Sequence, residues 1–435
     1  MKFSKKQVLI IGGVFIFIIV LLIVVFSNLR QNGPVLPPAN LLMWGFDDKP
    51  VFDKAIESYQ KSRTGIKVKY QKVSETNYDS LLIDALAAGT GPDIFMVGNR
   101  SVARQKNKMQ PAAATQYLLT QLRSDFPQVV EQDFVQDGRI WALPLYIDTL
   151  SLLYNKDFFD QAGIVYPPKT WDEFQSDVAA LRKIESGDRI KIAGAAIGGS
   201  EKTIPGAVDL LNLLMLQNGT EMLDQKGYAA VFSDGGKNGK GMAAFNFYLS
   251  FANPYSQFYT WGDTQPNAID SFSSEGTAMI FGYQSTFNLV KNKNPFLNFA
   301  AAAAPQPTGA ERSIAYANYR GLTVSKQSRA PAAAWDFIIY LATTPAVSHD
   351  YLSGTNRSPA LKSIIDEKKN DPDIGIFARQ ALIARSWAQA DDRQIKNIFS
   401  GAIANVLMGQ TDSFRALGQA QDQINAVMKA ARLGS

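Results

Sequence analysis

The sequence contains no cysteine and only one histidine among its 435 residues. Without cysteine, the chain offers no structural disulfide, no thiolate metal site and no thiol for lipid attachment. The single histidine, His349, excludes a metal centre built from several histidines and argues against a histidine-based catalytic triad. We therefore expect no metal ion, no cofactor and no catalytic residues.

A strong charge excess is also missing from most of the chain, although the net charge is +5. Residues 1–39 contain four basic residues and no acidic one, so 40 of the 44 basic residues face all 39 acidic residues in the remainder. This nearly neutral remainder gives no electrostatic reason to expect nucleic-acid binding.

An uninterrupted apolar run extends from Val8 to Phe26. As a helix it would be about 28 Å long, which matches the hydrocarbon core of a bilayer. Lysines precede the run, which predicts a cytoplasmic N-terminus and an extracellular remainder. A secretory signal is the alternative, but no small-x-small cleavage site follows Phe26. We expect an uncleaved single-pass anchor with its cytoplasmic stub at 1–28, followed by a linker at 29–39 that three prolines stiffen.

The first segments after the linker alternate between strand and helix patterns. Strands are predicted at 41–44, 66–70 and 91–97. One predicted helix has Pro50 in its first turn, and a second begins near Ser74. This order predicts an α/β fold with mostly parallel sheets, in which ligands meet the ends of the strands.

The stretch from Trp141 to Phe159 carries the most information about function. Pro144 cannot donate to a sheet ladder, so 141–146 is expected at a sheet edge. The apolar run at 150–154 predicts a buried strand, which places the carboxylate of Asp148 just before the start of this strand. The simplest interpretation is a strand with a polar end, and the functional one is a ligand-binding carboxylate.

The amino-acid sequences of several segments resemble those of one protein family. The stretch 148–159, Asp-Thr-Leu-Ser-Leu-Leu-Tyr-Asn-Lys-Asp-Phe-Phe, and the motif Gly-Thr-Gly-Pro-Asp-Ile at 89–94 resemble the extracellular solute-binding proteins of ATP-binding-cassette importers, particularly the maltose-binding branch. The resemblance implies a two-lobed periplasmic-binding-protein-like fold. It also implies that 148–159 passes the hinge from one lobe into the other, beside the ligand.

Later patterns complete the predicted organisation. Thr170 and Glu173 form a capping box for a helix that reaches about Ile184. Further strands are predicted at 193–197, 277–283, 299–304 and 321–325, and helices at 208–216, 241–251, 331–341 and in series after 359. We place lobe one at 40–148 plus 303–342, and lobe two at 149–302 plus 343–435.

The resemblance also implies candidate ligand-binding residues at strand ends. By position they are Asp47 or Asp48, Asn99, Arg100, Asp148, and Tyr283, which stands where the family has a ligand-stacking tryptophan. Four more candidate residues are added because their aromatic or guanidinium side chains lie in predicted loops: Trp261, Tyr319, Arg320 and Trp387. Carboxylates and amides bind sugar hydroxyls, and aromatic faces stack on sugar rings.

Each of these candidates also has a structural alternative. Trp261 and Trp387 could pack in a core. Asp47 and Asp48 could stabilise the N-terminus of the following helix. Arg320 could bind an anionic ligand group or pair within the protein.

The function implied by the resemblance is capture of a carbohydrate-like ligand between the lobes and its delivery to the permease subunits of an ATP-binding-cassette transporter. We expect a monomer that contacts the membrane through its N-terminal helix. Two alternatives stay open. One is a glycoside hydrolase that uses two of Asp47, Asp93 and Asp148, and the other is a tethered adaptor without a ligand.

Overall fold

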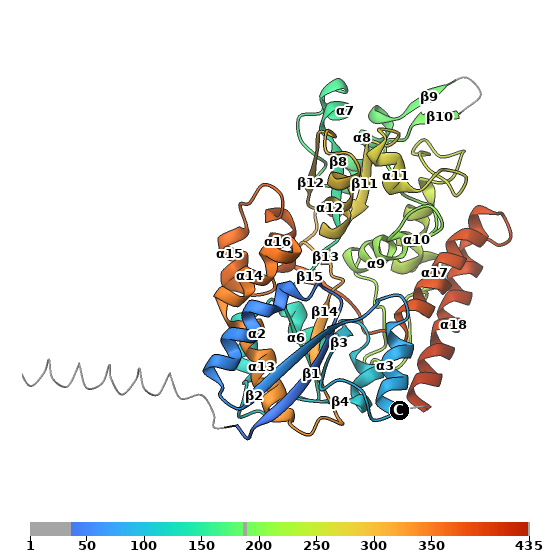
Figure 1. Cartoon of the computed structure of the whole chain (residues 1–435). Helices are drawn as coiled ribbons and strands as arrows, with labels where there is room; N and C mark the ends of the chain where they lie inside the picture. The colour runs from blue at the N-terminus through green and yellow to red at the C-terminus, as the bar shows by residue number, and fades with distance from the viewer. Residues whose placement is uncertain (1–35, 186–188, 434–435) are drawn as a thin grey trace, which may run out of the picture.

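The computed structural model describes residues 36–185 and 189–433, which form two lobes. In Figure 1 the sheet of lobe one lies below and that of lobe two above. Lobe one contains a six-stranded sheet in the order β2-β1-β3-β14-β4, with β7 beside β14. Its strands are β1 (Ala39–Gly45), β2 (Ile66–Lys72), β3 (Ile94–Gly98), β4 (Met109–Gln110), β7 (Leu143–Pro144) and β14 (Arg320–Ser325). β5 (Val135–Gln136) and β6 (Arg139–Ile140) form a separate hairpin.

Helices cover this sheet in the way that the apolar pattern predicts. α2 (Pro50–Ser62) has proline in its first turn and buries Phe52, Ile56 and Tyr59 on one face. Gly65, with φ of 101°, turns the chain into β2, whose side chains alternate between buried and exposed. The other helices of this lobe are α3 (Tyr78–Ala87), α4 (Val102–Gln105), α5 (Leu119–Asp125), α6 (Gln128–Phe134), α13 (Pro331–Thr343), α14 (Pro345–Thr355) and α15 (Lys362–Lys368).

The strand directions bring polar segments to one edge of the sheet. β1 runs parallel to β2 and β3, whereas β14 is antiparallel to β3. β14 arrives from lobe two, so it begins at the edge where the other three strands end. The loops after β1 and β3 and the start of β14 therefore all face lobe two.

The sheet of lobe two differs from the sequence prediction. β8 (Ser151–Asn155) lies between β11 (Met279–Gly282) and β12 (Phe299–Ala302) and is antiparallel to both. The prediction of a mostly parallel sheet is therefore wrong for this lobe. β8 leads the chain away from lobe one, whereas β11 and β12 both lead it back toward lobe one. The helix α12 (Gln284–Lys293) connects β11 to β12. A pattern of apolar runs cannot reveal this change of direction.

Helices complete lobe two around this small sheet. They are α7 (Lys156–Gln161), α8 (Trp171–Leu181), α9 (Ala207–Gln217), α10 (Lys240–Ser250), α11 (Ala268–Ser273), α17 (Asp392–Leu407) and α18 (Ser413–Leu433). The capping box is confirmed, because Thr170 accepts from the Glu173 N–H while Glu173 accepts from the Thr170 N–H. β9 (Lys183–Glu185) and β10 (Arg189–Ile192) form a hairpin where the predicted helix was to end. The predicted strand at 193–197 is reduced to a bridge between Ala193 and Thr277.

The two hydrophobic cores revise the lobe boundaries. α14 and α15 pack in the core of lobe one, where Tyr351 lies against Phe52 with ring centroids 5.6 Å apart. The sequence-based bounds assign 343–435 to lobe two, but within this stretch the core of lobe two begins at Phe377, and α16 (Gly375–Ala381) also contributes Ala378 and Ala381 to the core of lobe one. Ala304, Ile314 and Tyr316, placed in lobe one by the sequence, pack in lobe two. Amphipathic patterns indicate that these segments are buried, but not against which lobe.

Three chain segments cross between the lobes side by side. The strand β13 (Ala315–Tyr316) pairs with β15 (Ala384–Arg385), which follows α16 (Gly375–Ala381). The third segment joins them through a bridge between Thr149 and Ala317 and a hydrogen bond from the Asn318 N–H to the Asp148 carbonyl. These segments form the hinge.

Among the described residues, none of the helices combines the length and the apolar character that crossing a bilayer requires. The predicted span at 8–26 lies outside the described residues.

Candidate functional site

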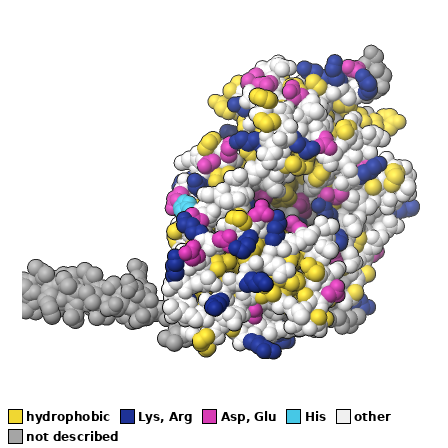
Figure 2. All heavy atoms as spheres, in the orientation of Figure 1, with side chains coloured by type: hydrophobic (Ala, Val, Ile, Leu, Met, Phe, Trp, Pro, Cys, Tyr) yellow, Lys and Arg dark blue, Asp and Glu magenta, His cyan; other side chains and the backbone are white. Residues whose placement is uncertain are grey.

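The candidate site is the cleft between the lobes, which contains two neighbouring cavities. Figure 2 shows the face of the molecule hollowed between the lobes, with acidic and basic side chains around the hollow. One cavity has a volume of 440 Å³ and is bordered by α12, so we call it the α12 cavity. The other has a volume of 450 Å³ and is bordered by the N-terminal part of α17, so we call it the α17 cavity.

Asp47 reaches the α12 cavity from the loop after β1. Its two carboxylate oxygens accept hydrogen bonds from Tyr351 and Arg357, each at 2.9 Å. Its neighbour Asp48 is exposed and pairs with Lys72. Both carboxylates thus have partners outside the helix that follows them.

Asp148 borders the same cavity from the hinge. One carboxylate oxygen accepts the N–H of Gln284 at 2.9 Å and that of Thr149 at 3.0 Å, so Asp148 joins the hinge to the start of α12. Burial raises the pKa of Asp148 from 3.8 to about 6, against the opposing effects of the Gln284 N–H and of Arg357. This buried carboxylate is held by backbone groups and leaves oxygen lone pairs for a ligand.

Polar side chains of α12 face these carboxylates across the α12 cavity. Ser285, Asn288 and Asn292 border it at helical spacing, and Phe46 adds an aromatic face from lobe one. The α12 cavity thus combines carboxylates, amides and an aromatic ring.

Arg320 borders the α17 cavity, and its side chain packs against Phe46, which borders the α12 cavity. Its guanidinium carbon lies 4.8 Å from the centroid of the Phe46 ring, and it donates to Glu75 at 2.7 Å. The internal alternative for Arg320 is therefore the one that the structure shows.

Arg100 connects the lobes beside the α17 cavity. From lobe one it donates to Asp209 at 2.8 Å and to the Tyr316 hydroxyl at 3.0 Å, and it pairs with Asp392 at 3.1 Å. Tyr283 donates to the other oxygen of Asp209 at 2.7 Å. Tyr283 packs against the core of lobe two, its hydroxyl is bound within the protein, and it is not among the residues that border the α12 and α17 cavities.

Three further predicted residues around the cleft, Asn99, Tyr319 and Trp387, are all buried. Asn99 donates to Asp133 at 2.9 Å and borders the α17 cavity, as does the buried Tyr319, whose hydroxyl donates to the Val129 carbonyl. Trp387 borders a third cavity of 310 Å³ and donates to Asn212.

Trp261 lies elsewhere, in the core of lobe two, where it donates to Thr203. The loop position chosen from the sequence does not bring it to the cleft, because its large apolar ring packs inward. The core-packing alternative therefore describes Trp261.

Comparisons with known proteins agree with this geometry. The family model described as bacterial extracellular solute-binding protein matches residues 46–347. The chain belongs to the bacterial extracellular solute-binding protein family.

Individual relatives of this solute-binding protein are distant but cover most of it. It is 24% identical over 354 residues to the maltodextrin-binding protein MdxE of Bacillus subtilis, which covers 75% of this chain and 77% of the relative. It is 22% identical over 414 residues to the galactooligosaccharide-binding protein of the same organism, covering 91% of each chain.

The solved structures show the same fold. The sugar-binding protein MalE of Xanthomonas citri matches with a TM-score of 0.76 and 20% identity, covering 91% of this chain and 98% of that one. The cyclic α-maltosyl-1,6-maltose binding protein of Arthrobacter globiformis matches with a TM-score of 0.75 and 18% identity, covering 90% and 100%. These relatives are binding proteins rather than enzymes, so the hydrolase alternative is rejected.

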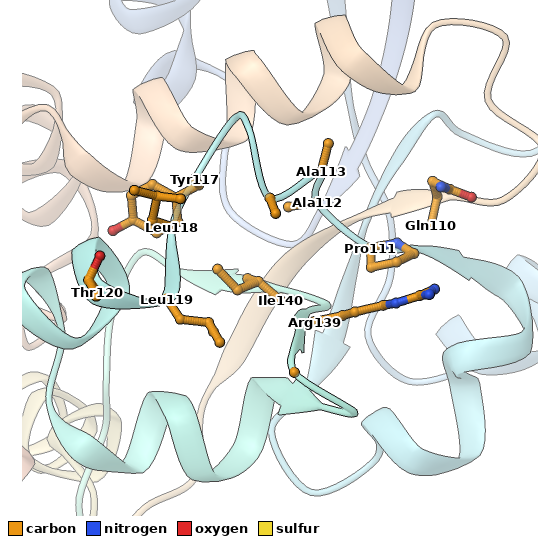
Figure 3. Close-up of a pocket in the computed structure, with 12 residues that line it drawn as sticks. Gln110, Pro111, Ala112, Ala113, Tyr117, Leu118, Leu119, Thr120, Arg139 and Ile140 are labelled. Atoms are coloured by element: carbon orange, nitrogen blue, oxygen red, sulfur yellow. The ribbon is translucent and has the colours of Figure 1, made fainter.

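A larger cavity of this solute-binding protein lies away from the cleft. It has a volume of 670 Å³, and Figure 3 shows it between 110–114 and 117–120 of lobe one, with Ile140 between them. Alanine, leucine and proline make up half of its lining residues, and none of the predicted ligand-binding residues is among them. We place the site in the cleft, because the polar side chains converge there.

Sequence reasoning missed several residues of the cleft. Asp209 lies in α9, whose apolar residues predict only a buried helix, and Arg357 follows α14 in a segment that the sequence assigned to the other lobe. Gln284 is buried beside the α12 cavity, and no described residue is a hydrogen-bond partner of its amide. The sequence feature that could have pointed to Gln284 was its position next to the candidate residue Tyr283.

Proposed function

We propose that this protein is a membrane-tethered extracellular receptor that binds an oligosaccharide-like ligand in the cleft and delivers it to an ATP-binding-cassette importer. The observation that carries the proposal is the α12 cavity, where Asp47 and Asp148 face Asn288 and Asn292 across a space between the lobes. Sugar hydroxyls both donate and accept hydrogen bonds, so mixed carboxylates and amides suit them.

The charges of the cleft favour a neutral ligand over an anionic one. Arg357 is paired with Asp47, Arg320 with Glu75, and Arg100 with Asp209 and Asp392. A carboxylate or phosphate group that binds one of these three arginines would have to displace its acidic partner. Hydroxyl groups can instead bind the remaining lone pairs and amide groups without breaking an ion pair.

The relatives give independent support for a sugar. Their names record binding of maltodextrin and of galactooligosaccharide, and each alignment covers at least 75% of both chains. Low identity leaves the individual sugar open, and the same family supports transfer of the ligand to importer permease subunits.

The mechanism follows from the hinge. Three short segments join the lobes, so rotation about them opens and closes the cleft with small changes within each lobe. A ligand that contacts both Asp47 of lobe one and α12 of lobe two binds the closed arrangement more tightly. Closure is then driven by this differential affinity.

Membrane tethering is a separate part of the proposal. It rests on the apolar run at 8–26 and the proline-containing linker at 29–39. Cell fractionation of the native protein tests it. We expect recovery with the membrane and release by detergent, whereas soluble protein with its N-terminus near residue 30 would refute tethering.

Ligand binding is tested with residues 36–435 by calorimetry and thermal shift, using maltotriose and a galactotriose as probes and glucose 6-phosphate as an anionic comparison. A bound ligand stabilises the folded state by RT ln(1 + [L]/Kd), so a neutral oligosaccharide should raise the melting temperature. Failure of a broad panel of neutral oligosaccharides to bind, with binding of an anionic compound instead, would refute the proposal.

The role of Asp148 in ligand binding is tested with a matched pair of aspartate-to-asparagine variants. Asp148→Asn should weaken binding by about 1.5–3 kcal/mol, the range for hydrogen bonds to charged groups. Asp93→Asn is the control, because Asp93 also accepts a backbone N–H, from Leu42 at 2.9 Å, but lies inside lobe one. Equal affinity of the two variants for the best probe would show that Asp148 does not bind the ligand.

A further inference from the structure

Asp209 makes contact with both lobes through its two carboxylate oxygens. It lies on α9 of lobe two with only 5% of its side chain exposed. Oδ1 accepts from Arg100 of lobe one at 2.8 Å, and Oδ2 accepts from Tyr283 of lobe two at 2.7 Å. One carboxylate therefore sets the positions of a candidate ligand-binding side chain from each lobe.

The surroundings keep this carboxylate ionised. Burial opposes ionisation of Asp209, but the positive charges of Arg100 and Lys396 and the hydrogen bond from Tyr283 outweigh burial and hold its pKa below the usual value. Lys396 is itself paired with Glu201 at 3.0 Å. Asp209 thus faces Arg100 as an anion facing a cation.

Asp209 is absent from the residues that border the cleft cavities, whereas Arg100 borders the α17 cavity. Tyr283 is absent from these residues as well, so the influence of Asp209 on a ligand passes through Arg100. Arg100 follows β3 of lobe one and Asp209 lies on α9 of lobe two, so their contact spans the two lobes and separation of the lobes would break it.

We propose that Asp209 is a positioning residue that couples closure of the lobes to the placement of Arg100 and Tyr283, a role that rests on the cleft being the ligand site. When the lobes separate, Arg100 and Asp209 both become hydrated. Hydration roughly offsets the attraction of a buried ion pair, so the contact can form and break reversibly. A near balance of this kind suits an element with two discrete arrangements.

The chain contains a matched control within one lobe. Asp336 of α13 accepts from Arg63 at 3.0 Å and from the Tyr59 hydroxyl at 2.9 Å, which repeats the arginine–aspartate–tyrosine arrangement of Asp209 inside lobe one. Asp336→Asn should therefore lower stability without changing the separation of the lobes.

The test measures lobe separation directly. Because the chain has no cysteine, Lys67→Cys in lobe one and Tyr255→Cys in lobe two introduce two exposed sites for spin labels in residues 36–435. Distance distributions are recorded by pulsed electron resonance without added ligand, for the doubly labelled parent and for the Asp209→Asn and Asp336→Asn variants. Binding of sugar plays no part in this readout, so failure of the sugar proposal would be seen separately.

We expect Asp209→Asn to raise the ratio of open to closed lobes about tenfold, which corresponds to about 1.4 kcal/mol. Asp336→Asn should keep the parent distribution while lowering the melting temperature. Arg100→Lys disturbs the same contact from lobe one and serves if Asp209→Asn does not fold, since lysine cannot reproduce the arginine fork. A parent-like distribution in Asp209→Asn, or in Arg100→Lys if that variant must be used, would overturn the proposal.

Discussion

Replacing Asp148 with asparagine should stabilise the folded protein at neutral pH, even though it weakens ligand binding. Asp148 is 7% exposed at the hinge and accepts the N–H groups of Thr149 and Gln284. These bonds do not compensate fully for burial, since burial raises its pKa from 3.8 to about 6. Asparagine keeps a carbonyl oxygen for the N–H groups and removes the buried charge.

The magnitude follows from linkage between protonation and folding. The folded state holds the proton of Asp148 up to about pH 6, whereas the unfolded chain releases it near pH 3.8. Between these values the folded state binds more protons, so the free energy of unfolding falls as pH rises. Each unit of pKa corresponds to about 1.4 kcal/mol, so the charge of Asp148 costs about 3 kcal/mol at pH 7.

Urea unfolding of both proteins at pH 4, 5, 6 and 7 measures this difference. The variant should be more stable by about 3 kcal/mol at pH 7, and the gap should shrink to below about 1 kcal/mol at pH 4. Subtraction cancels other groups, including Asp133, whose pKa burial also raises to about 6. A variant that is less stable than the wild type at pH 7, or a gap independent of pH, would refute the reasoning.

Three further predictions concern single side chains. Trp261→Ala should lower the free energy of unfolding by about 3–5 kcal/mol, because it empties part of the lobe two core, and affinity for sugar should not change in protein that remains folded. Thr170→Ala removes a helix cap and should cost about 1 kcal/mol in urea unfolding, with Ser176→Ala as a control on the same helix; an equal loss in both would argue against the cap. Tyr283→Ala should reduce affinity for a sugar probe more than it reduces stability, while Tyr283→Phe isolates the hydroxyl bond to Asp209. Loss of stability alone in Tyr283→Ala would assign the ring to packing.

The sequence by itself determined much of the local structure and the family. Alternation of Ile66, Val68 and Tyr70, the proline of α2 and the capping box of α8 depend on neighbouring residues, and the structure reproduces them. The strand and the helix within 148–159 also follow from the local sequence pattern, and this segment indicated the family.

Tertiary structure alone decided how these pieces combine into the cleft. The antiparallel sheet of lobe two and the packing of α14 and α15 in lobe one depend on contacts between distant segments. The same holds for Arg100 and Asp209, which are 109 positions apart in sequence and 2.8 Å apart in space. Periodicity reports which face of an element is buried, but the partner of that face is chosen by packing and by pairing of buried charges.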